Sequence, residues 1–309
     1  MRVFPETPDA VYPKNVLCPP PHLPMIDSHQ HFWDPERGDY GWLHPGSALY
    51  RTYGPIDLAP LLEANGILGS ILVQAAPTAQ ETDYLLELAR DTPWILGVIG
   101  WIDLAARDAP LRIRERAGNP LFVGVRPMLQ DLAKRDWILG PELIPGVEAV
   151  QEAGLTFDAL VRADQLTVIA TLADRHPALS IVLDHAGKPP FAVSSALASW
   201  RREIQSLSKR PNVSCKLSGL MTELEGLGGD EMLDPCIDML IDLFGPDRLL
   251  WGSDWPVATT AIEYSDWLIR CRSRIECQLL SHHAAIFGGN ARRLYRLARD
   301  ETVRPSKAE

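Results

Sequence analysis

The chain has 309 residues, of which 46% are hydrophobic, and a formal net charge of −10 from 30 basic and 40 acidic residues. This hydrophobic content is ample for a large core, and the length fits one or two domains. The net charge argues against nucleic acid and anionic membranes as partners. No segment has the length and purity of a membrane span. A small-molecule substrate is the expected partner.

Residues 1–24 are rich in proline and lack periodicity, so we expect an extended arm. They do not have the pattern of a secretory signal. The five cysteines are odd in number and show no CxxC spacing, which favours reduced thiols and a cytoplasmic location. Residues 25–309 are predicted to form a single domain, and a homo-oligomer is left open.

From Met25 onward, short apolar runs alternate with amphipathic stretches. Strands that alternate with helices indicate a parallel sheet, and eight such units indicate an α/β fold, a (β/α)8 TIM barrel. The expected strands are Met25–Asp27, Gly69–Gln74, Ile95–Trp101, Phe122–Arg126, Thr156–Val161, Ser180–Leu183, Val213–Leu217 and Arg248–Trp251. The expected helices are Asp57–Ala64, Ala79–Arg90, Asp164–Arg175, Leu197–Leu207 and Met232–Phe244, with two further helical segments within Ile275–Leu297.

Active sites of such barrels lie at the carboxyl ends of the strands. The first strand is followed by His29 and His31, whose i, i+2 spacing directs both imidazoles to the same side. Further polar groups at strand ends are Gln74, Trp101, Asp103, Arg126, Arg162, Asp184, His185, Lys188, Lys216, Ser218 and Asp254. The convergence of these groups on one rim predicts an enzyme.

Six segments occur together and in order: HQHFWDP (29–35), GVR (124–126), DHAGK (184–188), CKLSG (215–219), WGSDWP (251–256) and IFGGNAR (286–292). This set resembles the amidohydrolase superfamily, in its branch of sugar lactonases and 2-pyrone-4,6-dicarboxylate lactonase. The resemblance runs from about Met25 to Leu297 and implies a distorted barrel that hydrolyses lactones. In place of the strand-4 lysine that bridges two metals in many members, this chain has Arg126, so we expect no binuclear site.

The resemblance implies that Asp254 is the general base, and that His29, His31 and His185 stabilise the oxyanion or bind metal. These four residues are also the predicted ligands of at most one divalent ion, with zinc expected, although a metal-independent site is an alternative. Each histidine could instead have a structural role, and Asp254 could be a capping or turn residue. Asp184 is expected to orient a partner.

Five residues are candidates for binding the substrate. Arg126 could bind a substrate oxygen bidentately or could close an internal salt bridge. Lys216 offers the same two alternatives, and Gln74 could bind a hydroxyl. Trp33 and Trp101 could stack on a sugar ring or could simply pack in loops.

The predicted function is hydrolysis of a sugar-acid lactone (an aldonolactone) by water attack on the carbonyl. The alternative is a metal-dependent decarboxylase of an aromatic or dicarboxylic acid, because the His-x-His pair, a further histidine and the last aspartate also suit that chemistry. A binding protein on the same barrel is disfavoured by the intact polar rim.

Overall fold

The structure is a computed structural model, and it describes residues 25–224, 226, 230–276 and 280–297. The predictions for the N-terminal arm, Cys18 and Cys277 lie outside these residues.

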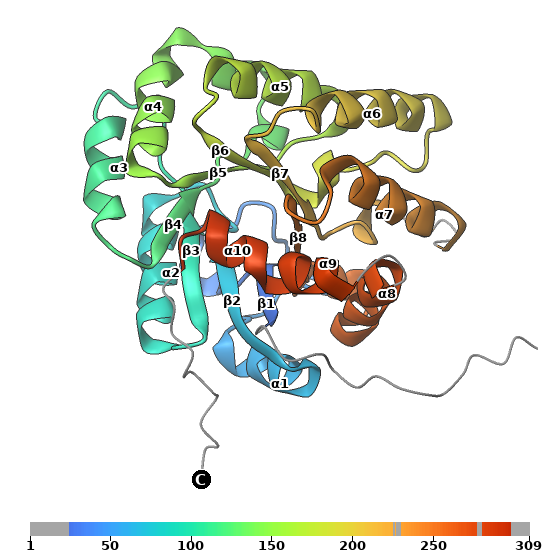
Figure 1. Cartoon of the computed structure of the whole chain (residues 1–309). Coiled ribbons are helices and arrows are strands. Elements are labelled where there is room, and N and C mark those ends of the chain that lie inside the picture. The colour runs from blue at the N-terminus through green and yellow to red at the C-terminus, as the bar shows by residue number, and fades with distance from the viewer. Residues whose placement is uncertain (1–24, 225, 227–229, 277–279, 298–309) are drawn as a thin grey trace, which may run out of the picture.

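Eight parallel strands form one sheet whose order follows the sequence (Figure 1). The ring closes where Gln30 bridges Trp255, and the first strand lies against the last. The predicted (β/α)8 barrel is confirmed, and register breaks among its first four strands distort it. The strands are β1 (Met25–Gln30), β2 (Ile67–Val73), β3 (Ile95–Gly100), β4 (Phe122–Val125), β5 (Thr156–Ala159), β6 (Ser180–Leu183), β7 (Val213–Leu217) and β8 (Leu249–Trp251).

Helices surround the barrel (Figure 1). Those before the last strand connect successive strands, and those from Tyr264 onward follow it. They are α1 (Pro55–Asn65), α2 (Ala79–Asp91), α3 (Ala109–Ala117), α4 (Ile144–Ala153), α5 (Leu166–Arg175), α6 (Ser194–Leu207), α7 (Asp230–Phe244), α8 (Tyr264–Glu276), α9 (Leu280–Ala284) and α10 (Asn290–Leu294). The sequence analysis did not name α3, α4 or α8. Helix α3 buries only Ala109 and Ile113, so it has little apolar periodicity to detect.

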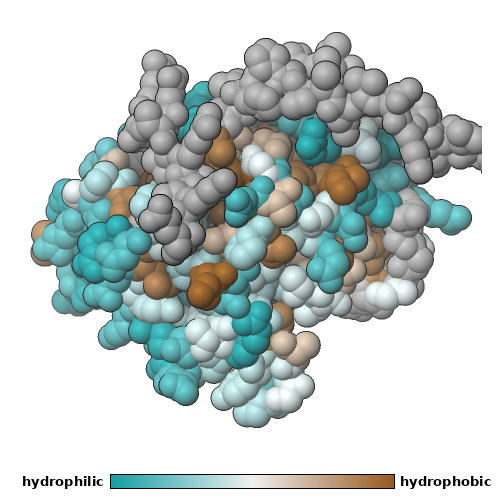
Figure 2. All heavy atoms as spheres, turned by 90° about the horizontal axis from the view of Figure 1, so that it is seen from below, coloured by the Kyte–Doolittle hydropathy of each residue, from teal (hydrophilic) through white to brown (hydrophobic). Residues whose placement is uncertain are grey.

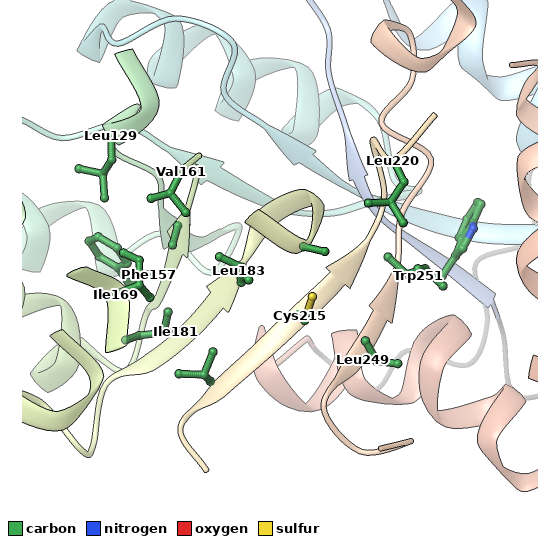
Figure 3. Close-up of a cluster of buried hydrophobic side chains, with 14 of the residues drawn as sticks. Leu129, Phe157, Val161, Ile169, Ile181, Leu183, Cys215, Leu220, Leu249 and Trp251 are labelled. Atoms are coloured by element: carbon green, nitrogen blue, oxygen red, sulfur yellow. The ribbon is translucent and has the colours of Figure 1, made fainter. Parts of the chain in front are cut away.

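Strand side chains alternate between an outer core and the barrel interior. Phe157, Ile181, Cys215 and Trp251 point toward the surrounding helices (Figure 3). Their strand neighbours face inward, where Val182 and Leu250 pack with Tyr295, just beyond α10. The interior is therefore a packed core, and two charged residues of β5 and β7, Asp158 and Lys216, share it.

Among the described helices, none combines the length and apolar character needed to cross a membrane. On the face seen in Figure 2, apolar side chains form small separate patches among polar ones.

Candidate active site

The first and last strands are joined by hydrogen bonds that position the catalytic candidates. The Asp254 backbone N–H donates to the His29 carbonyl oxygen at 2.8 Å, and the His31 N–H donates to the Trp255 carbonyl at 2.8 Å. Asp254 has a φ of 58°, a left-handed conformation that non-glycine residues adopt at a cost of about 1–3 kcal/mol. These contacts hold the Asp254 carboxylate over the end of β1.

A left-handed turn directly after β6 places His185. His185, Ala186 and Lys188 have φ values of 51°, 50° and 53°. The Trp200 indole N–H donates to the Ala186 carbonyl at 2.8 Å and holds the turn against α6. The His185 Nδ1 lies 3.0 Å from the Ser218 hydroxyl, which fixes the ring orientation and directs Nε2 toward Asp254.

Two glycines allow the catalytic side chains to approach one another. A Cβ at Gly219 would lie 2.4 Å from His185 Nδ1 and 2.9 Å from Asp254 Oδ2. A Cβ at Gly252 would lie 2.6 Å from the His29 Cβ. Both contacts are too short for any other residue. The sequence analysis quoted both glycines within motifs but gave them no role.

The structure brings the four predicted catalytic residues together. The Nε2 atoms of His29, His31 and His185 lie 3.6, 3.4 and 3.9 Å from Asp254 Oδ1. The two Nε2 atoms of His29 and His31 are 3.1 Å apart. Nitrogen and oxygen ligands thus converge on one small region that is almost fully buried.

The local environment sets the charges of this cluster. Burial lowers the pKa of His185 to about 4, outweighing the opposing effect of Asp254. Burial and then the Lys216 ammonium hold the pKa of His29 well below its usual range. Burial alone would raise the pKa of Asp254, but His185 and the other two histidines outweigh it and keep this pKa below its ordinary value. Near neutral pH the Asp254 carboxylate therefore lies beside the neutral imidazoles of His29 and His185.

The same donor set fits a divalent metal ion. Ligand atoms of His29, His185 and Asp254 all lie within 4.8 Å of one another. The His31 Nδ1–H donates to the Val73 carbonyl oxygen at 2.8 Å, which directs Nε2 into the cluster. Imidazole nitrogens and one carboxylate are ordinary zinc ligands. The residues present therefore fit the predicted single ion.

Lys216 lies beneath His29 in a fully buried charge cluster. Its Nζ is 2.6 Å from Asp158 Oδ2, 3.1 Å from Asp184 Oδ1 and 3.2 Å from His29 Nδ1. Because Lys216 is fully buried, it has no surface to offer a substrate, so we do not retain the predicted binding role. The alternative of an internal ion pair describes its position. The sequence analysis did not identify Asp158. Its position as a charged residue within the otherwise apolar fifth strand is the signal that could have revealed it.

Arg126 and Gln74 are also buried and contact each other. Arg126 donates through Nη1 to Asp184 at 3.1 Å and through Nη2 to the Gln74 carbonyl oxygen. The Gln74 side-chain amide donates to the Arg126 carbonyl oxygen at 2.8 Å and thereby positions Arg126. Gln74 is not among the residues that line the cavity described below. Arg126 Nε is buried without a hydrogen-bond partner among the described residues. Only a small part of Arg126, 3% of its surface, is exposed and could meet a bound molecule.

A cavity of about 320 Å³ opens over these groups. It is lined by His31, His185, Asp254 and Arg126, together with loop residues that include Trp33, Trp42, Lys188 and Glu223. Trp33 is fully buried and forms an edge contact with Trp42, at 5.1 Å between ring centroids, so the more exposed Trp42 presents the larger aromatic surface. Trp101 lines a neighbouring cavity and not this one. It therefore does not face the space over Asp254, where the sequence analysis expected it to contact the substrate.

Neither cation in the cavity wall is without a counter-charge. Arg126 pairs with Asp184, and Lys188 Nζ lies 3.4 Å from Glu223. Asp131, Glu223 and Asp254 add negative charge to the lining. The wall is therefore better suited to a neutral polyol than to a dianion, because a dianion would have to compete with these carboxylates.

Known proteins resemble this chain over most of its length. The L-fucono-1,5-lactonase of Burkholderia ambifaria is 43% identical, covering 89% of this chain and 96% of the relative. The protein of the same name from Burkholderia multivorans is 40% identical, covering 88% and 96%. A solved amidohydrolase structure from Burkholderia multivorans with bound zinc has a TM-score of 0.84 and 39% identity, covering 89% of this chain and all of the other. The profile of the amidohydrolase family matches residues 26–297, and the chain belongs to that family.

Proposed function

We propose that this enzyme hydrolyses the 1,5-lactone of a neutral sugar acid, with L-fucono-1,5-lactone or a lactone of similar shape as its substrate. The observation that carries the proposal is the Asp254 carboxylate, which faces three imidazoles in a cavity without an unbalanced cation. The names of the two Burkholderia relatives support it, at 43% and 40% identity.

In the proposed reaction, the lactone carbonyl carbon lies next to a water molecule held by Asp254. Asp254 removes a proton from the water as the water oxygen bonds to the carbonyl carbon. The ring C–O bond then breaks, and the proton on Asp254 passes to the leaving ring oxygen. The product is an open-chain hydroxy acid, which releases one proton to solution.

His185 is the proposed donor to the carbonyl oxygen as negative charge develops there. If the Ser218 hydroxyl donates to Nδ1, Nε2 carries the proton of the neutral ring and can donate to the oxyanion. Arg126 lines the cavity, and the exposed part of its side chain would bind an oxygen of the substrate. Asp184 positions both Arg126 and His29, since its two carboxylate oxygens contact them.

In a metal-bound site, His29, His31, His185 and Asp254 would hold one divalent ion, most readily zinc, and His185 would then be a ligand through Nε2 in place of a donor to the carbonyl oxygen. When bound, this ion would act as a Lewis acid on the carbonyl oxygen. A second ion would meet the buried ammonium of Lys216 and the guanidinium of Arg126, so we expect at most one ion per chain. Elemental analysis of the purified protein that gave two tightly bound ions per chain would contradict this.

The activity is tested by a pH-indicator screen against aldono-1,5-lactones, run before and after chelation. The expected result is acid release well above spontaneous hydrolysis, with 6-deoxy and neutral lactones preferred over dicarboxylate lactones. Loss of activity on chelation, restored by zinc, would assign a role to the metal. Acid release no faster than in buffer for every lactone would overturn the proposal, and carbon dioxide release from an aromatic acid would favour a decarboxylase instead.

A cytoplasmic location is proposed from cysteine chemistry. Cys215, Cys236 and Cys271 are buried free thiols, as expected in a reducing compartment. A homo-oligomer stays a prediction, to be checked by light scattering.

A further inference from the structure

A second cavity, of about 470 Å³, lies beside the catalytic one over the ends of β1–β4. The two cavities share Trp42, Met128 and Asp131 in their walls. A molecule bound over Asp254 could therefore extend into the second cavity without leaving the catalytic face of the barrel. Nothing in the proposed hydrolysis of a single-ring lactone uses this space.

Three indole rings line the second cavity, from Trp42, Trp101 and Trp137. They come from the loops after β1, β3 and β4, so they surround the space from different strands. The Trp42 ring is fixed by its N–H, which donates to the Ala75 carbonyl at 2.8 Å, and it is 40% exposed. Rigid, partly exposed aromatic faces suit the C–H face of a sugar ring, which is apolar at the centre and polar at the edge.

The polar groups of this cavity are hydrogen-bond acceptors. Asp39, Asp103 and Asp131 contribute carboxylates, and no Lys or Arg appears among the described lining residues; Asp39 pairs with Arg37, outside the lining, at 2.9 Å. Hydroxyl groups can donate to these oxygens. A phosphate or carboxylate group would be repelled, and a purely aromatic group would bury the carboxylates without donors. A neutral ring that carries several hydroxyls meets both requirements.

We propose that the second cavity is a subsite for a neutral sugar ring joined to the lactone, so that the enzyme also hydrolyses glycosylated aldonolactones. The lactone ring occupies the catalytic cavity, and the second ring, linked through O2, O3 or O4 of the lactone, lies among Trp42, Trp101 and Trp137. This inference rests on the proposed lactonase activity for its catalytic part. The affinity of the subsite for a second ring can be measured without any turnover.

The first test compares the best monosaccharide lactone with its O2-, O3- and O4-glycosyl derivatives in the wild type and in Trp137→Ala. Trp137 lines the second cavity and not the catalytic one. The control is Trp94→Ala, which removes a half-buried indole that lines neither of the two cavities. We expect at least one glycosylated lactone to be hydrolysed, with kcat/KM lowered about three- to tenfold in Trp137→Ala, the size of one lost aromatic contact. The monosaccharide lactone should not show this selective loss, and Trp94→Ala should not produce it. Asp103→Asn gives a second variant in case Trp137→Ala folds poorly.

The second test measures binding by calorimetry with two compounds that cannot be hydrolysed, the sugar alditol and its glycosyl alditol. Tighter binding of the glycosyl alditol, lost in Trp137→Ala but kept in Trp94→Ala, supports the subsite even if no lactone is turned over. Equal affinity for both alditols, together with hydrolysis of the monosaccharide lactone alone, would overturn the subsite and leave the lactonase standing. Absence of hydrolysis of any lactone would count against the lactonase only.

Discussion

Replacing Lys216 with methionine tests whether the buried charge cluster beneath His29 stabilises the fold as a unit. The substitution keeps a long side chain but removes an ammonium that contacts Asp158 at 2.6 Å and Asp184 at 3.1 Å, all three groups being fully buried. Asp184 keeps Arg126, whereas Asp158 keeps only the hydroxyls of Thr156 and Tyr295. Asp158 therefore loses its ionic partner in a fully buried site.

Breaking a buried pair on one side typically costs about 3–5 kcal/mol in the free energy of unfolding. For 309 residues, an unfolding entropy of about 2.1 cal/mol/K per residue converts this cost to a fall in Tm of roughly 5–8 °C. Urea unfolding followed by tryptophan fluorescence and by circular dichroism measures the loss. The exposed Lys209→Met is the control, with an expected change within about 0.5 kcal/mol.

The double variant Lys216→Met with Asp158→Asn distinguishes an uncompensated charge from lost packing. Because the second change removes the charge that the first one stranded, the pair should be more stable than Lys216→Met alone. The reasoning is refuted if Lys216→Met unfolds at the same urea concentration as the Lys209 control, or if Asp158→Asn lowers stability further.

Three other predictions concern the site and its surroundings. Asp254→Asn should lower kcat by about 10²–10⁴-fold with an unchanged circular dichroism spectrum, because it removes the proposed base, and wild-type rates would exclude this role. Arg126→Lys should lower kcat/KM by about tenfold, because an ammonium cannot reproduce the planar group that donates to Asp184 and to the Gln74 carbonyl while facing the cavity; a lower Tm with unchanged kinetics would leave Arg126 a purely structural role. Burial raises the pKa of Glu81 to about 7 from 4.5, so the folded state keeps a proton that the unfolded chain releases. The contribution of Glu81 to the free energy of unfolding is fully present below pH 4.5, and roughly 3 kcal/mol of it is lost as the pH rises through 7. In Glu81→Gln, the free energy of unfolding measured by urea titration should depend less on pH over this range.

The barrel and the meeting of His29, His31, His185 and Asp254 at one end of it could be predicted because each depends on local pattern. An apolar run that ends in His29-Gln-His31 or in Gly252-Ser-Asp254 identifies both a strand and the polar group at its end. The predicted sugar-lactone hydrolase agrees with the names of the two Burkholderia relatives.

The roles of inward-facing and loop residues depend on positions that local pattern does not fix. Lys216 was predicted at the rim, but its place in β7 points it to the interior, where it meets Asp158 of β5. The sequence suggested Arg162 as the polar end of the fifth strand, yet that strand ends at Ala159 and Arg162 is exposed. Trp101 follows its strand as expected, but the course of the next loop decides which cavity it lines.

The proposed catalytic cluster lies on the junction between β1 and β8, so we expect activity to report closure of the barrel. His29 and Asp254 are more than 220 positions apart, and both are held by hydrogen bonds that cross this junction. A growing polypeptide cannot assemble the cluster until the last strand has emerged, and contacts between such distant positions form slowly because of the entropy of closing a long loop. During refolding, activity should therefore return later than the circular dichroism signal of the helices, because β8 must first pair with β1.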